Sequence, residues 1–243
     1  MRRGFFLWVA LLMSVFFVSC KGKRKISDEA HMETKTMSEQ KSDWVSLMDP
    51  SLWRGYNQQD LPGNWEFKGD LIECYGEGGD IGGDIITKAT YDNFELRLEW
   101  KITKGGNSGI FYHVVESDSY KAPYETGAEY QLLDDVGFPD PIEDWQKSGA
   151  NYAMHTADKG KKKLKPVGEW NSSRIIFNKG YVEHWLNGEK IVEFNKFSED
   201  WKTKRNSGKW NDFPDYGKAS DGYLGLQDHG AGVWFKNVEV RRL

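Results

Sequence analysis

The chain has 243 residues, a formal net charge of −4 and an aromatic content of 14%. The acidic balance argues against nucleic acid as a partner, because phosphate recognition needs a surplus of clustered lysine and arginine. The length is sufficient for one sizeable domain with its own core, and two cysteines are too few for a disulfide framework. Composition therefore favours a globular, aromatic-rich domain.

The first twenty residues are typical of an export signal. Two arginines precede an apolar run over residues 5–18, which ends at Ser19 and Cys20. The run is too short to span a bilayer comfortably, and a small residue before cysteine is typical of a bacterial lipoprotein cleavage site. We predict that Cys20 is lipidated and that the lipid anchor alone holds the chain at the cell envelope, at the periplasmic face or the outer membrane. The alternative is an uncleaved apolar anchor.

Residues 21–43 are rich in Lys, Glu, Ser, Thr and Asp and have almost no apolar periodicity. Such a segment cannot bury enough apolar surface to offset the entropy of ordering it. We predict a disordered polar tether over residues 21–43, followed by a single domain over residues 44–243. If Cys20 carries lipid, Cys74 is the one remaining thiol, so this domain has no internal disulfide.

The pattern over residues 44–243 predicts a succession of short strands. Residues 94–102 alternate apolar and charged side chains, which predicts a strand with one buried and one solvated face. Turns at residues 178–180 and at Asn187-Gly188 predict two consecutive hairpins, since Asn-Gly is a strong hairpin signal. A last strand is expected over residues 233–240, with a bulge at Asn237. Together these features predict an all-β, two-sheet sandwich.

Two polar segments interrupt this pattern. Residues 140–146 and 199–210 each favour a short helical turn or a lid. Their tryptophans, Trp145, Trp201 and Trp210, are expected to face solvent and to contact the part of a glycoside beyond its reacting sugar.

A glycine-rich polar turn leads directly into an aromatic strand between residues 105 and 113. We interpret this segment as the floor of a binding cleft of sugar size. Asn107, Ser108 and Tyr112 are candidate substrate ligands, and His113 is a candidate proton-transfer group. The alternative for Asn107 and Ser108 is a purely structural turn.

Glu129 and Gln131 are two residues apart on a predicted strand, so they share one face while Tyr130 and Leu132 share the other. Glu129 is a candidate base and Gln131 a candidate ligand of a sugar hydroxyl. The alternative for Glu129 is a carboxylate held in a buried hydrogen-bond or ion-pair network.

Two further segments offer the groups that sugars need. Trp170 and Asn171 place a ring beside an amide, which suits the apolar face and polar edge of a sugar. The run Gln227, Asp228 and His229 ends a strand and would supply a substrate ligand, a carboxylate that orients a histidine, and a proton-transfer group. The sequence contains no tight metal motif. A divalent metal nevertheless remains an open alternative if His113, Glu129, Asp228 and His229 converge.

Seven segments in order carry a family resemblance. They are Trp44–Met48, Tyr91–Leu96, Gly106–Ile110, Gly127–Gln131, Gly168–Asn171, Leu186–Gly188 and Gly225–Gly230. Over about residues 44–243 the chain resembles the 3-keto-disaccharide hydrolase domain. The resemblance implies a jelly-roll sandwich of the concanavalin A-like or laminin-G-like type. It also implies an envelope enzyme acting on glycosides whose glucose ring carries a ketone at carbon 3.

The chemistry of such a substrate sets what the site must provide. A ketone at carbon 3 acidifies the hydrogen on carbon 2, so a base there can expel the group on carbon 1, and water then adds to the enone. The site needs a base, a stabiliser of the enolate oxygen and an acid for the leaving oxygen, for which Glu129, His113, Asp228 and His229 are the candidates. No dinucleotide-binding glycine pattern is present, so a separate sugar 3-dehydrogenase is expected to supply the substrate.

Two other functions remain open at this level. A non-catalytic carbohydrate-binding lipoprotein would use the same amides and rings, and fold alone does not distinguish it from an enzyme. A classical endo-glucanase would need two carboxylates on one strand face, where this chain has Glu129, Gln131 and Leu133.

Overall fold

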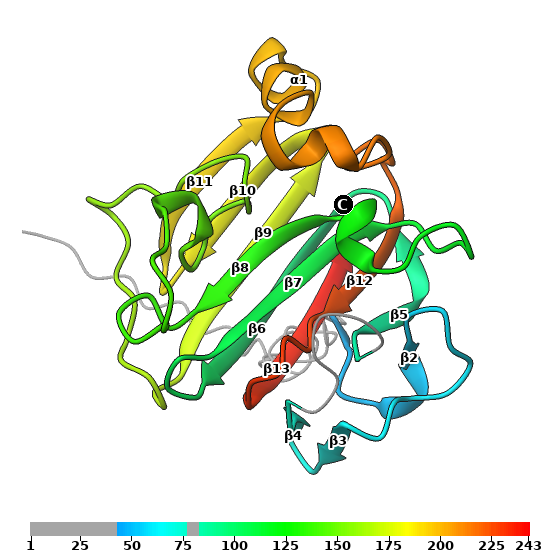
Figure 1. Cartoon of the computed structure of the whole chain (residues 1–243). Helices are drawn as coiled ribbons and strands as arrows, with labels where there is room; N and C mark the ends of the chain where they lie inside the picture. The colour runs from blue at the N-terminus through cyan, green and yellow to red at the C-terminus, as the bar shows by residue number, and fades with distance from the viewer. Residues whose placement is uncertain (1–42, 77–82) are drawn as a thin grey trace, which may run out of the picture. The chain divides into compact units, whose positions relative to one another are not determined.

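The computed structural model describes residues 43–76 and 83–243, which form a two-sheet β-sandwich (Figure 1). The predicted all-β architecture is confirmed. Cys20 and residues 21–42 of the predicted tether lie outside the described residues. Within the described ranges, no helix is long and apolar enough to cross a membrane.

The larger sheet has eight strands, all in antiparallel pairs. Its order is β11 (Glu189–Asn195), β10 (Tyr181–Leu186), β9 (Asn171–Asn178), β6 (Phe94–Ile102), β13 (Val233–Arg242), β4 (Leu71–Cys74) and β3 (Trp65–Lys68), and β1 (Val45–Ser46) also pairs with β13. The smaller sheet has five antiparallel strands, in the order β2 (Trp53–Gly55), β5 (Ile85–Tyr91), β12 (Gly222–Leu226), β7 (Asn107–Val114) and β8 (Ala128–Leu133).

Alternating side chains from both sheets fill the space between them. The apolar residues of β6 are buried on one face, from Phe94 to Ile102. From the smaller sheet, β8 contributes Tyr130 and Leu132, and β12 contributes Leu224 and Leu226. Because side chains alternate along a strand, the residues between these positions face the outer side of the smaller sheet. That outer face carries the polar residues of the candidate site.

The local predictions for the strands are confirmed. Residues 94–102 form β6, and the two predicted hairpins join β9 to β10 and β10 to β11. The bulge at Asn237 is present: this residue has a φ of 51°, and the register of β13 against β6 shifts between Lys236 and Glu239.

Both polar segments contain short helices, as predicted. They are η4 (Asp144–Gln146), α1 (Glu199–Arg205) and η5 (Gly208–Asp212). The described residues also contain the helical turns η2 (Pro50–Leu52) and η3 (Pro123–Glu125). The expected exposure of the tryptophans is wrong for Trp201 and Trp210, which are 3% and 2% exposed. Each stacks on Tyr216, and Trp201 also stacks on Phe194. Their polar neighbours in sequence concealed this burial.

Candidate active site

Glu129 and Gln131 share the outer face of β8, as the sequence predicted. Their neighbours Tyr130 and Leu132 belong to the core between the sheets. Both polar residues are nevertheless buried, with 5% of Glu129 and 2% of Gln131 exposed. Burial of a carboxylate needs a reason, because removing a charge from water is costly unless it is paired.

Gly109 on β7 provides the space for the Glu129 carboxylate. In the register of β7 against β8, Gly109 is opposite Gln131 and Phe111 is opposite Glu129. A Cβ atom at Gly109 would lie 2.2 Å from Oε1 of Glu129, so the carboxylate occupies the volume that any other side chain would take. The glycine is required here for close approach and not for an unusual backbone angle.

Two amide oxygens beside this carboxylate lack hydrogen bonds. Gln227 donates its backbone N–H to the Gly109 carbonyl over 3.0 Å, and alternation after Leu226 turns its side chain to the outer face. Gln131 donates from Nε2 to Oδ1 of Asn107 over 3.2 Å. Across residues 43–76 and 83–243, the Oε1 atoms of Gln131 and Gln227 are buried without a partner. Buried acceptors of this kind are expected where a ligand supplies the donor.

The electrostatics of the site favour a proton-transfer role for Glu129. Burial raises the pKa of Glu129 to about 7, and the positive charge of Lys209 opposes that rise. A carboxyl group with a pKa near 7 exists in both protonation states at neutral pH, so it can accept a proton and return it.

Lys209, whose charge acts on Glu129, packs on aromatic rings. The Lys209 ammonium lies 4.9 Å from the ring centre of Tyr124 and 4.6 Å from that of Tyr152. Tyr152 donates its backbone N–H to the Glu129 carbonyl, and its ring meets that of Trp145 edge to face at 5.5 Å. The site therefore combines a cation, aromatic surfaces and a carboxylate.

Asp228 lies in a different environment. Its Oδ2 accepts a hydrogen bond from Asn64 at 2.6 Å, and its Oδ1 accepts one from the Gly230 backbone at 2.9 Å. It is completely buried and fixes the turn that follows β12. His229, next in this turn, is partly exposed.

Ser108 is also buried and donates to the Gln227 carbonyl at 2.8 Å, so it supports the strand pairing behind Gln227.

His113 and Tyr112 differ from their predicted placement on a cleft floor. His113 has a φ of 56°. Between the paired residues Tyr223–Val114 and Gly225–Phe111, β7 contains two residues where β12 contains one, so β7 has a bulge at this point. This bulge interrupts alternation. The His113 ring consequently packs at 4.2 Å from that of Phe177 and donates from Nε2 to the Asp92 carbonyl, while burial lowers its pKa to about 4. Tyr112 is in the core, hydrogen-bonded to His184.

Trp170 and Asn171 are placed at the larger sheet and not beside Glu129. Asn171 opens β9 and is paired with Trp100 of β6. Its Oδ1 accepts from the Lys165 backbone and from the Asn187 side chain, so it organises adjoining loops. The Trp170 ring carries the ammonium of Lys236 at 4.4 Å.

The predicted residues thus separate into those that lie together on the outer face of the smaller sheet and those that lie elsewhere. Asn107, Glu129, Gln131 and Gln227 gather on the outer face around Gly109. The candidate metal ligands do not gather: His113 packs on the core side while Asp228 is held in its own turn. Among the described residues, no group of three or more His, Cys, Asp or Glu side chains is arranged to hold a metal ion.

Three residues of the site, Lys209, Tyr124 and Gly109, were not predicted from the sequence. Lys209 lies in η5 and Tyr124 in η3, two short helical turns whose position over the sheet has no local signature in the sequence. Gly109 had a signal, because a glycine inside a strand pattern often marks a close approach.

A buried carboxylate, amides and aromatic rings on the outer face of one sheet are the kinds of groups from which proteins build sites for small polar molecules. The family comparison makes this specific. Residues 43–241 match the model of the 3-keto-alpha-glucoside-1,2-lyase-like domain, and the chain belongs to this family. It is accordingly an enzyme of the glycosidase type.

Individual relatives agree with this assignment. A 3-keto-disaccharide hydrolase of Bacteroides thetaiotaomicron is 30% identical over the full length of both chains. A candidate glycosyl hydrolase from Parabacteroides distasonis has a crystal structure that matches with a TM-score of 0.77 and 45% identity, covering 82% of this chain and 94% of that one. A second candidate glycosyl hydrolase from that organism, at 24% identity and a TM-score of 0.65, covers 82% of this chain and 99% of its own and supports the fold alone.

Proposed function

We propose that this protein cleaves 3-keto glycosides or 3-keto disaccharides by elimination and hydration, with Glu129 as the base that removes the proton from carbon 2. The observation that carries the proposal is the state of Glu129: a buried carboxylate with a pKa of about 7, beside two amide oxygens that lack partners within the described chain. Family membership and the name of the Bacteroides relative support the substrate class.

The reaction follows from the acidity of carbon 2 next to the ketone. Glu129 takes the proton, the electrons of the C–H bond form a double bond between carbons 1 and 2, and the bond from carbon 1 to the leaving oxygen breaks. The leaving oxygen takes up a proton. Water then adds its oxygen to carbon 1 and a proton to carbon 2, so the net change is hydrolysis. Protonated Glu129 is suited to deliver a proton because its pKa is close to neutral.

The other residues of the outer face would bind and orient the sugar. The free Oε1 atoms of Gln131 and Gln227 would accept hydrogen bonds from sugar hydroxyls. Lys209 would place a positive charge where the ketone oxygen becomes an enolate, and its position over Tyr124 and Tyr152 fixes the ammonium near Glu129. The rings of Tyr152 and Trp145 would cover the apolar face of a sugar.

The test compares a 3-keto glucoside with the same glucoside unoxidised, using wild type and Glu129→Gln. We expect turnover of the keto form only and a loss of about 100-fold to 10,000-fold in kcat for the variant, the usual contribution of a general base. Binding of the keto substrate should be retained. If neither sugar is turned over while both are bound, the protein is a glycan-binding lipoprotein. If the unoxidised sugar is cleaved equally well, the elimination mechanism is wrong.

We also propose the cellular context. A ketone at carbon 3 must be introduced by an oxidation, so a separate sugar 3-dehydrogenase acts before this enzyme. Lipidation at Cys20 would hold the protein at the cell envelope, where exported glycosides are met. Labelling of cells with a radioactive fatty acid tests the anchor: wild type should carry label and Cys20→Ser should not. Label on both proteins would place the lipid elsewhere.

A further inference from the structure

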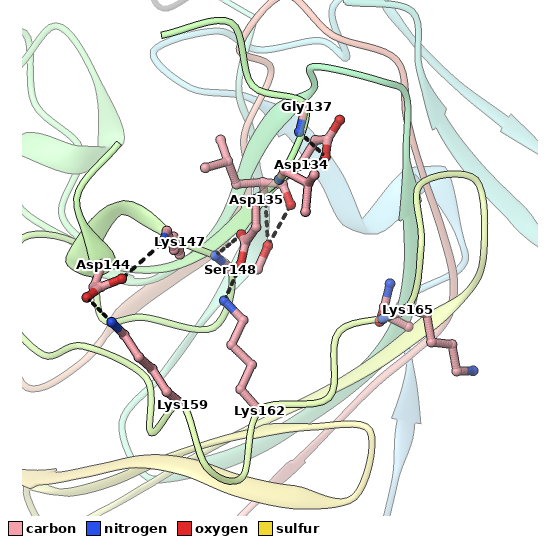
Figure 2. Close-up of polar contacts among 12 residues, drawn as sticks. Asp134, Asp135, Gly137, Asp144, Lys147, Ser148, Lys159, Lys162 and Lys165 are labelled. Carbon is pink, nitrogen blue, oxygen red and sulfur yellow. Dashed lines mark hydrogen bonds and ion pairs between the residues drawn. The ribbon is translucent and has the colours of Figure 1, made fainter. Parts of the chain in front are cut away.

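We propose a second ligand site, separate from Glu129, that binds a small apolar organic anion such as an aromatic carboxylate. The site is a cavity of about 870 Å³ that is lined by the end of β8 and by the loop that continues from it to β9, and Figure 2 shows charged residues of this lining. Its volume falls in the range of small-molecule sites, roughly 300–1,000 Å³.

The apolar part of the cavity consists of side chains from three elements. Trp100 and Ile102 come from β6, and Leu133 is the last residue of β8. Leu164 and Val167 come from the loop opposite. Val167 is 40% exposed, so apolar surface remains accessible at the opening. A ligand body of rings or methylene groups would bury this surface, which favours binding.

The polar part is a cluster of three lysines around two carboxylates. Lys162 is 2.5 Å from Asp135, with side-chain exposures of only 12% and 13%. Lys147 and Lys159 both pair with Asp144, at 2.9 Å and 2.5 Å. Figure 2 shows the three ammonium groups directed at these two carboxylates. The cluster has one more positive than negative charge.

Three carboxylates of the cavity, those of Asp134, Asp135 and Asp144, are already occupied by donors. Asp135 also accepts the Ser148 backbone N–H at 2.8 Å, and Asp134 accepts three backbone N–H groups, those of Gly105, Val136 and Gly137. Each lysine ammonium, in contrast, has three N–H donors. The cluster therefore has a surplus of donors and of positive charge. Burial lowers the pKa of Lys162, so its ammonium lacks some of the stabilisation that water would give.

These two parts together specify the chemistry of the ligand. An anionic group satisfies the donors of Lys147, Lys159 and Lys162, and the apolar body packs on Leu133, Leu164 and Val167. A neutral sugar fits less well, because it lacks the charge that the lysines favour. Charge-assisted hydrogen bonds are about twice as strong as neutral ones, so the anion should be preferred over a neutral molecule of the same shape.

The probes are 2-naphthoate and its neutral counterpart 2-naphthamide, measured by isothermal titration calorimetry on the purified protein. We expect one saturable naphthoate site and at least about tenfold weaker binding of the amide. Equal affinity for the two probes, or no saturable binding of naphthoate at millimolar concentration, would overturn the proposal.

Two matched pairs of variants locate the site. Lys159→Gln should weaken naphthoate binding several-fold, whereas Lys163→Gln, an equally exposed lysine on the same loop, should not. Val167→Asp should abolish it by placing a negative charge at the opening, whereas Val115→Asp, at a valine of similar exposure outside the cavity, should not. Thermal melts of all four verify folding. Identical affinities in all variants, or dependence on Glu129→Gln, would show that naphthoate binds elsewhere.

Discussion

Two buried carboxylates of this protein, Glu129 and Asp228, have opposite surroundings. Asp228 accepts hydrogen bonds from Asn64 and Gly230, which hold the turn after β12. Glu129 lies over Gly109, and its burial is the first cause of its raised pKa. The difference separates a carboxylate that stabilises the fold from one kept at a cost to stability. Reactive groups are commonly of the second kind.

The largest effect expected is on turnover. Glu129→Gln should lower kcat by about 100-fold to 10,000-fold, because the amide cannot accept the proton from carbon 2. Asp228→Asn should retain kcat within several-fold once the sample is folded, because that carboxylate orients backbone and not substrate. Steady-state kinetics on a 3-keto glucoside measure both. A larger loss in Asp228→Asn than in Glu129→Gln would reverse the assignment of roles.

Gly109→Ala should have the next largest effect on turnover. The new methyl group would overlap Oε1 of Glu129, so the carboxylate must move and kcat should fall by about 10-fold to 100-fold, as for other small misplacements of a reacting group. Gly63→Ala is the matched control, since its added methyl group meets nothing within 4 Å. Equal kinetics in the two variants would mean that Glu129 does not depend on the space over Gly109.

Stability should respond in opposite directions at the two carboxylates. The folded-state pKa of Glu129 is raised from 4.5 to about 7, so the wild type loses stability as pH rises through this window. Above pH 7, Glu129→Gln should be more stable than wild type by up to about 3 kcal/mol, and at pH 4 the gain should vanish. Asp228→Asn should instead cost about 1–3 kcal/mol, because an amide has one acceptor oxygen where the carboxylate uses two, so the donor of either Asn64 or Gly230 would face an NH2 group. Urea denaturation at pH 4 and pH 8 measures these differences.

The smallest effect is on the pH profile. Activity should rise with pH through an apparent pKa near 7 as Glu129 loses its proton. Lys209 lowers this pKa, so Lys209→Met should move the rise to higher pH, whereas Lys202→Met, at an exposed lysine of α1, should leave it in place. A profile that does not move in Lys209→Met would remove Lys209 from the electrostatics of the site.

The sequence was informative where a local pattern determines the structure. Alternation predicted β6 from Phe94 to Ile102 and the shared face of Glu129 and Gln131. It failed at His113, because a bulge in β7 turns this side chain toward the core, where Tyr112 already lies. It failed also at Trp210, since its stacking partner Tyr216 lies in a loop that no periodic signal describes. Lys209 reaches the site from η5, the helical turn that precedes this loop. The face to which a side chain points within a regular strand was therefore predictable. The packing of the segments between the strands was not.

The most direct test of the central claim uses the proton on carbon 2. A 3-keto glucoside labelled with deuterium at carbon 2 is compared with the unlabelled substrate under single-turnover conditions, with wild type and Glu129→Gln. Removal of this proton by Glu129 predicts a slower cleavage of the labelled substrate, loss of the label from the released 3-keto sugar in ordinary water, and neither cleavage nor label exchange in the variant. Cleavage by wild type with the label fully retained at carbon 2 and with no slowing of the labelled substrate would contradict proton abstraction and with it the assigned role of Glu129.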